Sequence, residues 1–147
     1  MQTTMQPTAA DLFGDPIHTY SRREAIEDGV LIDVSTTARE AGIVWPVALT
    51  SSAWADCVAW DEVTEARKGW TGQSESGRLW DVCWMLSLAI RGALRRGTDT
   101  TRPVLFQLVR VPRHGRGLRP RAALLKALIG PDDNGRPCLT VALPNED

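Results

Sequence analysis

The stretch SESGRLWDVCWMLSLAIRGALRRG, residues 74–97, decides the fold of this chain. Its apolar residues recur at intervals of three and four, which places them on one face of a helix. The residues of this face are Leu79, Val82, Cys83, Leu86, Ala89, Ile90 and Ala93. Gly97 suits the first position beyond the last turn, and three arginines suit the negative end of the helix dipole: Arg91, Arg95 and Arg96. The stretch therefore predicts a long central helix with one face in the core.

A second apolar stripe runs along the same helix, made by Trp80, Trp84 and Leu88 at four-residue intervals. With both stripes, the middle of the helix is apolar over most of its circumference, which is typical of a helix covered on more than one side. We therefore expect Trp80 and Trp84 to lie in the core.

Upstream of this helix, shorter elements are predicted from cap and strand signals. Ser21 followed by Glu24 matches a capping box and predicts a helix over Ser21–Asp28. The apolar run Val30–Val34 predicts a strand, and Ser35 is a candidate cap for a helix over Thr36–Ala41.

The next segment, Ile43–Leu49, has Pro46 at its middle. Because proline cannot donate to a ladder, we expect an edge strand or an extended segment there. Thr50, Ser51 and Ser52 are candidate caps for a helix from Ala53 to Trp60 that can continue to Glu65.

Downstream, the apolar pattern changes to strand-like runs bounded by Gly, Pro and Asn. Three runs, Val104–Val111, Ala122–Ile129 and Cys138–Leu143, predict an antiparallel β-meander. The predicted fold class is α+β, with the C-terminal meander packed against the long central helix and with short N-terminal helices and strands.

Length and composition restrict the class of protein. We expect a flexible arm over residues 1–12 and a single α+β domain over 13–147, since 147 residues suit one domain. Three widely spaced cysteines in apolar surroundings, Cys57, Cys83 and Cys138, favour reduced core thiols and hence a cytoplasmic protein. The sequence shows neither a signal peptide nor an apolar run long enough to span a membrane.

Motifs for catalysis, cofactors and metals are missing from the sequence. It contains two histidines and no HExxH, CxxC pair, P-loop, GxGxxG or GxSxG, so we expect no cofactor and no metal, and an enzyme is disfavoured but not excluded. If the protein is an enzyme, the candidate catalytic residues are His18, Asp33 and Asp81. Asp33 and Asp81 lie within apolar runs, so each is expected to be buried beside a partner, which for Asp81 is Arg78.

Arg22 and Arg23 are candidate anion-binding residues, because two adjacent arginines and the N–H groups at the start of a predicted helix can hold a phosphate or carboxylate. The simpler interpretation is that Ser21 caps this helix while both arginines face water. Both interpretations stay open from the sequence.

The segment RVPRHGRGLRPR, residues 110–121, carries five arginines and predicts a long basic hairpin loop. Its candidate binding residues are Arg110, Arg113, His114, Arg116, Arg119 and Arg121. Residues 91–126 hold ten Lys or Arg against one acid, although the net charge of the chain is −1. The basic half therefore either binds a protein or nucleic acid with an acidic surface, or is neutralised by acids of the same chain. Trp70, in a loop with two glycines, is predicted to be exposed and is a further candidate contact.

Five blocks of sequence, in order, carry a resemblance to a known family: FGDPIHTYSRREAIEDGVLIDVS (13–35), PVALT (46–50), SGRLWDVCWM (76–85), FQLVRVPR (106–113) and IGPDDNGRPCLTVALPNED (129–147). The chain resembles an uncharacterised family of small bacterial proteins, a domain of unknown function met on plasmids, phages and other mobile elements. The resemblance implies an accessory protein of mobile DNA and implies no catalytic residue.

Three functional hypotheses follow. The first is a non-catalytic accessory protein of a bacterial mobile element that binds a host macromolecule such as a defence or regulatory complex. The second is a nucleic-acid-binding protein that uses residues 110–121. The third is a small enzyme acting on a nucleotide or phosphorylated group.

Overall fold

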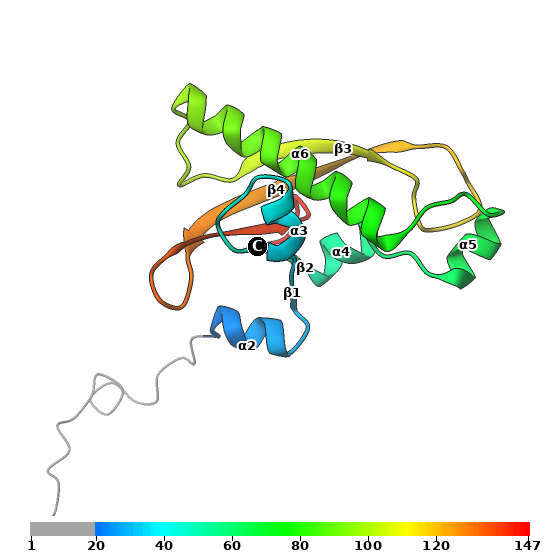
Figure 1. Ribbon diagram of the computed structural model, residues 1–147, viewed down its shortest axis with the longest axis horizontal. Helices are drawn as coiled ribbons and strands as arrows, with labels where there is room; N and C mark the ends of the chain where they lie inside the picture. The colour runs from blue at the N-terminus through cyan, green and yellow to red at the C-terminus, as the bar shows by residue number, and fades with distance from the viewer. Residues whose placement is uncertain (1–19) are drawn as a thin grey trace, which may run out of the picture.

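The structure, a computed structural model, describes residues 20–147 (Figure 1). The predicted arm over residues 1–12 lies outside this range. The described elements are α2 (Arg22–Glu27), β1 (Leu31–Asp33), α3 (Ser35–Glu40), β2 (Val47–Thr50), α4 (Ser51–Cys57), α5 (Glu62–Lys68), α6 (Glu75–Arg96), β3 (Val104–Arg110), β4 (Arg121–Pro131) and β5 (Pro137–Ala142).

The five strands form one mixed sheet in the order β1-β2-β5-β4-β3. β3, β4 and β5 pair antiparallel in succession, while β2 pairs parallel with β5 and antiparallel with β1. The predicted α+β class and C-terminal meander are therefore confirmed, and β1 and β3 are the two outer strands.

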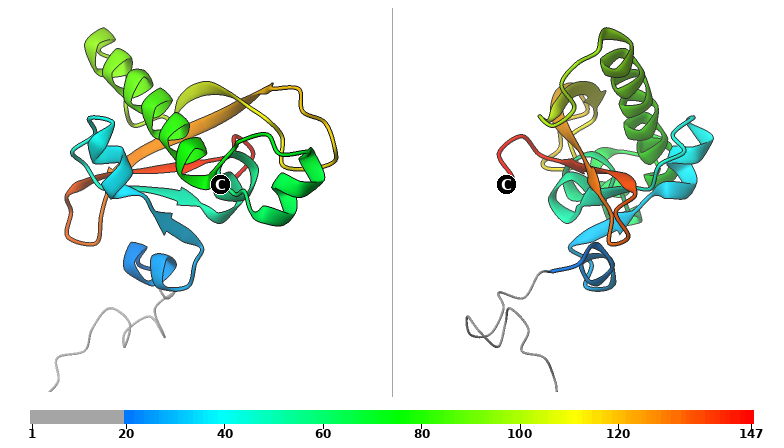
Figure 2. Two further views of the ribbon diagram at one scale, coloured as in Figure 1. Left: turned by 45° about the vertical axis from the view of Figure 1, so that its right-hand side comes forward. Right: turned by 90° about the vertical axis from the view of Figure 1, so that its left-hand side faces the viewer.

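The core lies between the sheet and the helices on one of its faces. Figure 2 shows α6 and α3 on the same side of the sheet, and α4 contributes to the same buried cluster. Leu86 of α6, Leu49 of β2, Leu125 of β4 and Val141 of β5 are fully buried there. On β3, buried Phe106 and Leu108 alternate with exposed residues, as expected of a strand with one face on the core.

The predicted ends of α2 and α6 are confirmed. The Ser21 side chain accepts a hydrogen bond from the backbone of Glu24, and the Ser74 side chain accepts one from the backbone of Gly77. Gly97 ends α6 in the left-handed conformation with φ 67°, which glycine adopts without steric cost.

The expected edge strand over Ile43–Leu49 is wrong. β2 begins at Val47, after Pro46, and lies inside the sheet between β1 and β5, so the missing N–H of proline falls just outside the strand. The carbonyl of Pro46 instead accepts a hydrogen bond from the backbone N–H of Leu139 at 2.9 Å.

The helix predicted from Ala53 to Trp60 is present as α4, but its continuation to Glu65 is wrong. α4 ends at Cys57, and α5 begins separately after Asp61, whose carboxylate accepts a hydrogen bond from the backbone N–H of Thr64 at 2.7 Å. Ser35 does not cap α3 either, because its hydroxyl accepts from the backbone N–H of Val47 at 3.0 Å.

The expected burial of the second stripe of α6 is wrong as well. Trp80 and Trp84 are 38% and 41% exposed, and Leu88 lies in solvent beside them. The two indole rings stack on each other, with ring centroids 6.0 Å apart and an interplanar angle of 15°. α6 is therefore covered on one face only, and its second apolar stripe is a surface feature.

Candidate functional site

The segment 110–121, named here the basic hairpin, joins β3 to β4 and is held from beneath by α5 (Figure 1). Nζ of Lys68 donates hydrogen bonds to the carbonyls of His114 and Gly117, at 2.8 and 2.6 Å. Lys68 is only 2% exposed, and its pKa is lowered by burial first and by repulsion from neighbouring cations second. The loop carbonyls thus solvate a buried ammonium group.

Arg67, the preceding residue of α5, also fixes this loop. Its Nε donates to the carbonyl of Gly115 at 3.1 Å, and its Nη2 donates to the carbonyl of Arg113 at 2.6 Å. Four carbonyl contacts from α5 therefore fix the loop backbone.

Two arginines of the basic hairpin are neutralised within the chain. Arg110 contacts both carboxylate oxygens of Asp56, at 2.9 and 3.1 Å, and its side chain is 14% exposed. Arg113 lies 3.7 Å from Asp61 in a more exposed pair. The carboxylate of Asp61 already caps α5, and its pKa is lowered mainly by the hydrogen bonds from Thr64.

The other three arginines, Arg116, Arg119 and Arg121, are exposed. None of them forms an ion pair with another residue in the range 20–147. The sequence left open whether the basic segment meets its own acids, and the structure divides it: Arg110 and Arg113 are paired, whereas Arg116 and Arg119 in the loop and Arg121 at its base are not.

Arg22 and Arg23 lie at the start of α2, where an anion from the chain itself is already bound. The Asp133 carboxylate accepts hydrogen bonds from the backbone N–H groups of Arg22 and Arg23, at 2.9 and 3.0 Å. The guanidinium of Arg22 donates to Thr140 Oγ1 and to the carbonyl of Leu139, both at 2.7 Å. Arg23 pairs on the surface with Glu27 at 3.2 Å.

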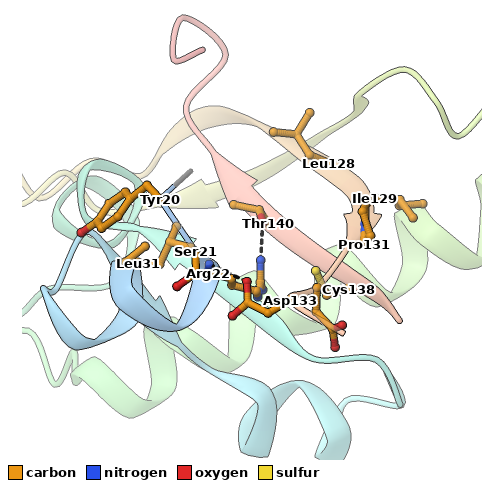
Figure 3. Close-up of a pocket in the computed structure, with 13 residues that line it drawn as sticks. Tyr20, Ser21, Arg22, Leu31, Leu128, Ile129, Pro131, Asp133, Cys138 and Thr140 are labelled. Carbon is orange, nitrogen blue, oxygen red and sulfur yellow. Dashed lines mark hydrogen bonds between the residues drawn. The ribbon is translucent and has the colours of Figure 1, made fainter. Parts of the chain in front are cut away.

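A cavity of about 640 Å³ opens beside this helix, between α2 and the ends of β4 and β5 (Figure 3). Two of its polar side chains form hydrogen bonds within the protein: the guanidinium of Arg22 donates to Thr140, and the hydroxyl of Tyr20 donates to Asp28. That hydrogen bond is the main cause that raises the pKa of Tyr20 to about 12. Cys138 in the wall is buried, and desolvation raises the pKa of its thiol. Figure 3 shows the hydrogen bond from Arg22 to Thr140 in this wall.

The three candidate catalytic residues are not assembled by the described structure. His18 lies outside the described residues. Asp33 is exposed rather than buried, and its carboxylate accepts from the backbone N–H and the hydroxyl of Ser35, at 3.1 and 2.5 Å. Asp81 is also exposed, on α6, so the expectation that both carboxylates are buried is wrong.

Arg78 was the expected partner of Asp81, but it is buried and bonds elsewhere. It donates to the carbonyls of Val58 and Val111, at 3.1 and 2.9 Å, and its guanidinium lies 4.7 Å from the ring centroid of Trp60. Burial is the main cause that lowers its pKa. Arg78 therefore ties α6 to the base of the basic hairpin.

Trp70 is 76% exposed, which confirms the expectation for this residue. It has a positive φ of 62°, and the turn that follows is held by the Glu65 carboxylate. That carboxylate accepts from the hydroxyl of Thr71 at 2.5 Å and from the backbone N–H groups of Thr71 and Gly72, at 2.6 and 3.0 Å. These bonds lower the pKa of Glu65.

The sequence patterns did not predict the groove that lies between α6 and β3. A cavity of about 510 Å³ is lined by Asp81, Trp84, Met85, Gln107, Leu108 and Val109. A second cavity, of about 210 Å³, shares Asp81, Leu108 and Val109 with the first and extends toward Arg110 and Pro120. The two form one groove, the α6–β3 groove, which runs from the exposed tryptophans to the basic hairpin.

A family model matches residues 9–147, which is nearly the whole chain. The chain belongs to a family of unknown function, DUF6573. No curated protein and no solved structure gives a significant match.

Within the described part of this DUF6573 chain, no three or more His, Cys, Asp or Glu side chains gather in a way that could bind a metal. All three cysteines are free and buried, and burial raises the pKa of Cys57 to about 11 and that of Cys83 to about 12. None of the helices in residues 20–147 has the length and apolar character needed to cross a bilayer.

Proposed function

We propose that the protein is a non-catalytic accessory protein of a bacterial mobile element, that it acts in the cytoplasm, and that it binds a host macromolecule. The bound partner contacts the α6–β3 groove and the tip of the basic hairpin. Buried thiols are consistent with a reducing compartment. The resemblance to proteins of plasmids and phages supports the genetic setting.

One observation carries the proposal: the stacked pair Trp80 and Trp84 is exposed beside the groove. Tryptophan and arginine are the residue types most enriched at the energetic centres of interfaces, and here both types border one groove. Large apolar side chains cost free energy when they remain in water. A partner that covers them gains this free energy on binding.

A binding role also agrees with the state of the polar side chains. Arg22, Asp33 and Arg78 are each engaged in hydrogen bonds that join or cap elements of the fold. The unpaired cations at Arg116, Arg119 and Arg121 suit recognition of an acidic surface.

Affinity capture tests this function. The purified protein is immobilised and incubated with nuclease-treated bacterial lysate, alongside a Trp80→Ser/Trp84→Ser variant. A matched control, Val44→Ser/Val63→Ser, removes two other exposed apolar side chains, which are 80% and 72% exposed. We expect the wild type and the control to retain the same partner and the tryptophan variant to lose it. Equal capture by all three proteins, or none by the wild type, contradicts the proposal.

Nucleic-acid binding is the second candidate, and the three unpaired arginines of the basic hairpin favour it. If these arginines neutralise phosphates, the affinity for DNA or RNA falls steeply as salt rises. Replacement of Arg116 and Arg119 by Ala should then weaken binding and reduce the salt dependence. Binding that is unaffected by salt excludes this candidate.

A further inference from the structure

We propose that the partner adds a β-strand to the outer edge of β3. The added segment is an extended peptide with apolar residues at alternate positions and acidic residues on both flanks. This inference rests on the proposed function and names the chemistry of the partner.

The first argument is the nature of the edge. β3 is an outer strand, so among the described strands only β4 pairs with it, and alternate N–H and C=O groups on its other side have no strand partner. β3 is seven residues long, and Val104–Val109 contains neither a charge nor a proline. Edges that must remain single are shortened or carry such residues. The opposite edge follows that rule, because β1 has three residues and ends in Asp33.

The second argument is the position of the α6–β3 groove. Phe106 and Leu108 face the core under α6, so Gln107 and Val109 point to the other face of the sheet. Gln107 and Val109 nevertheless share a cavity with Trp84 of α6. A cavity that touches residues of both faces lies at the open edge of the strand. The groove is therefore located where an added strand would lie.

The third argument is that apolar side chains border this edge on both faces. Trp80, Trp84 and Leu88 are exposed on the α6 side. Leu105, Val109 and Leu124 are exposed on the opposite face, at 59%, 63% and 41%. The side chains of a strand alternate between the two faces of a sheet. An added strand would therefore place every second side chain against the tryptophans of α6. Its remaining side chains would extend the apolar surface of Leu105 and Val109 on the opposite face.

The fourth argument is charge. Arg95, Arg96 and Arg102 lie around the end of α6 and the start of β3, beyond the residues that line the groove, and Arg102 pairs with Asp99 at 3.8 Å, which leaves Arg95 and Arg96 without an acidic partner among the described residues. The basic hairpin lies at the other end, and its three exposed arginines have no acidic partner among the described residues. Asp81 is the only acid in the wall of either cavity. Acidic flanks complement both ends.

The same charges disfavour a second copy of this chain as the occupant. Antiparallel pairing of two β3 strands would bring the basic hairpin of one copy beside Arg95, Arg96 and Arg102 of the other. A parallel pairing would place each basic end against its equivalent. Like charges meet in both arrangements, so an acidic strand from a different protein suits the groove better.

The test uses a phage-displayed library of random peptides of about 12 residues, which exceeds the span of β3 at about 3.3 Å per residue. The selected peptides are resynthesised with N-methyl groups in one of two registers, on odd or on even residues. N-methylation removes the donor that strand addition requires, and in a strand only every second donor points to the neighbour. Affinities are measured for the wild type, Trp80→Ser/Trp84→Ser and the control Val44→Ser/Val63→Ser, after circular dichroism has shown that all three are folded.

We expect selected peptides with alternating apolar residues and Asp or Glu at both ends. N-methylation in one register should weaken binding at least about tenfold, and N-methylation in the other should leave it nearly unchanged. The affinity of the tryptophan variant for the unmethylated peptide should also fall about tenfold, while that of the control should not. Equal effects of both registers, basic flanks, or failure to select any peptide would overturn strand addition. Displacement of the peptides by a tighter-binding single-stranded oligonucleotide, or concentration-dependent dimerisation of the protein through β3, would do so as well.

The two proposals can fail separately. If both N-methylation registers act equally while the tryptophan variant still loses its lysate partner, strand addition is wrong and the binding function stands. If the lysate partner is also retained by the tryptophan variant, the proposed function fails too.

Discussion

Nη2 of Arg110 lies within hydrogen-bonding distance of both carboxylate oxygens of Asp56, at 2.9 and 3.1 Å. These residues are distant in sequence, and their contact joins the end of β3 to α4. The pair removes one positive charge from the base of the basic hairpin. Arg110 therefore has a structural role, whereas the exposed Arg116, Arg119 and Arg121 remain available to a partner.

Replacement of Asp56 by Asn should destabilise the fold by about 1–3 kcal/mol, because a largely buried guanidinium would lose its counter-charge. Chemical denaturation measures the change. The control is Glu27→Gln, which breaks the exposed pair with Arg23, whose side chains are 82% and 61% exposed. We expect about 0.5 kcal/mol or less for that variant. Similar losses for both variants would show that the Arg110 pair is no more important than a surface pair.

Replacement of Lys68 by Met should release the hairpin loop, since its two hydrogen bonds to the carbonyls of His114 and Gly117 are lost. Limited digestion with trypsin reports this change directly, because the loop carries arginines at 113 and 116. Cleavage there should accelerate by about tenfold in the variant, since cleavage follows the population of the open loop. The control is Lys126→Met, the only other lysine of the chain. Unchanged cleavage of the Lys68 variant would show that the loop is ordered without α5.

Acid should loosen the α5 end of the molecule. The pKa values of Asp61 and Glu65 are lowered in the folded protein, chiefly by hydrogen bonds from Thr64 and Thr71. Because the pKa of each carboxyl is lower in the folded than in the unfolded protein, the ionised carboxylates stabilise the fold at a pH above the unfolded pKa. This stabilisation is lost as the pH falls below about 4. Hydrogen-exchange protection of Thr64, Thr71 and Gly72, whose backbone N–H groups donate to these carboxylates, should therefore fall on acidification once intrinsic rates are corrected for.

An Asp61→Asn/Glu65→Gln variant should show lower protection at neutral pH and a smaller further loss in acid. Glu62→Gln, which alters an exposed carboxylate on the same helix, is the control and should behave as the wild type. A variant with the full acid response of the wild type would exclude these two carboxylates as its cause.

Local signals were sufficient to predict much of this fold. The cap at Ser21, the stop at Gly97 and the three C-terminal strands are decided by residues close in sequence. The position of β2 inside the sheet is not, because it depends on parallel pairing with β5 about ninety residues away, and parallel pairing has no local signature. The separate start of α5 had a local signal that was missed, the cap at Asp61 followed by Thr64.

The surface was harder to predict for a physical reason. Helical periodicity shows which residues share a face, but not whether another element covers that face. Trp80 and Trp84 share a stripe, and only the sheet order shows that no described strand lies beyond β3 to cover them. Arg78 was predicted to pair with Asp81 and Arg110 to belong to a basic binding segment, yet both are structural, because carbonyls and a carboxylate from distant segments surround them.

Asp81 tests the charge argument for the groove. It is the only acid in the wall of the α6–β3 groove, where it opposes a partner with acidic flanks. Replacement by Asn should raise the affinity for such a peptide by about two- to fivefold, because one exposed like charge is worth about 0.2–1 kcal/mol. The gain should shrink as salt screens the interaction. The matched control is Glu75→Gln, which makes the same charge change on α6 outside the groove walls. A weaker affinity of the Asp81 variant would show that the carboxylate attracts the partner, which contradicts a partner with acidic flanks.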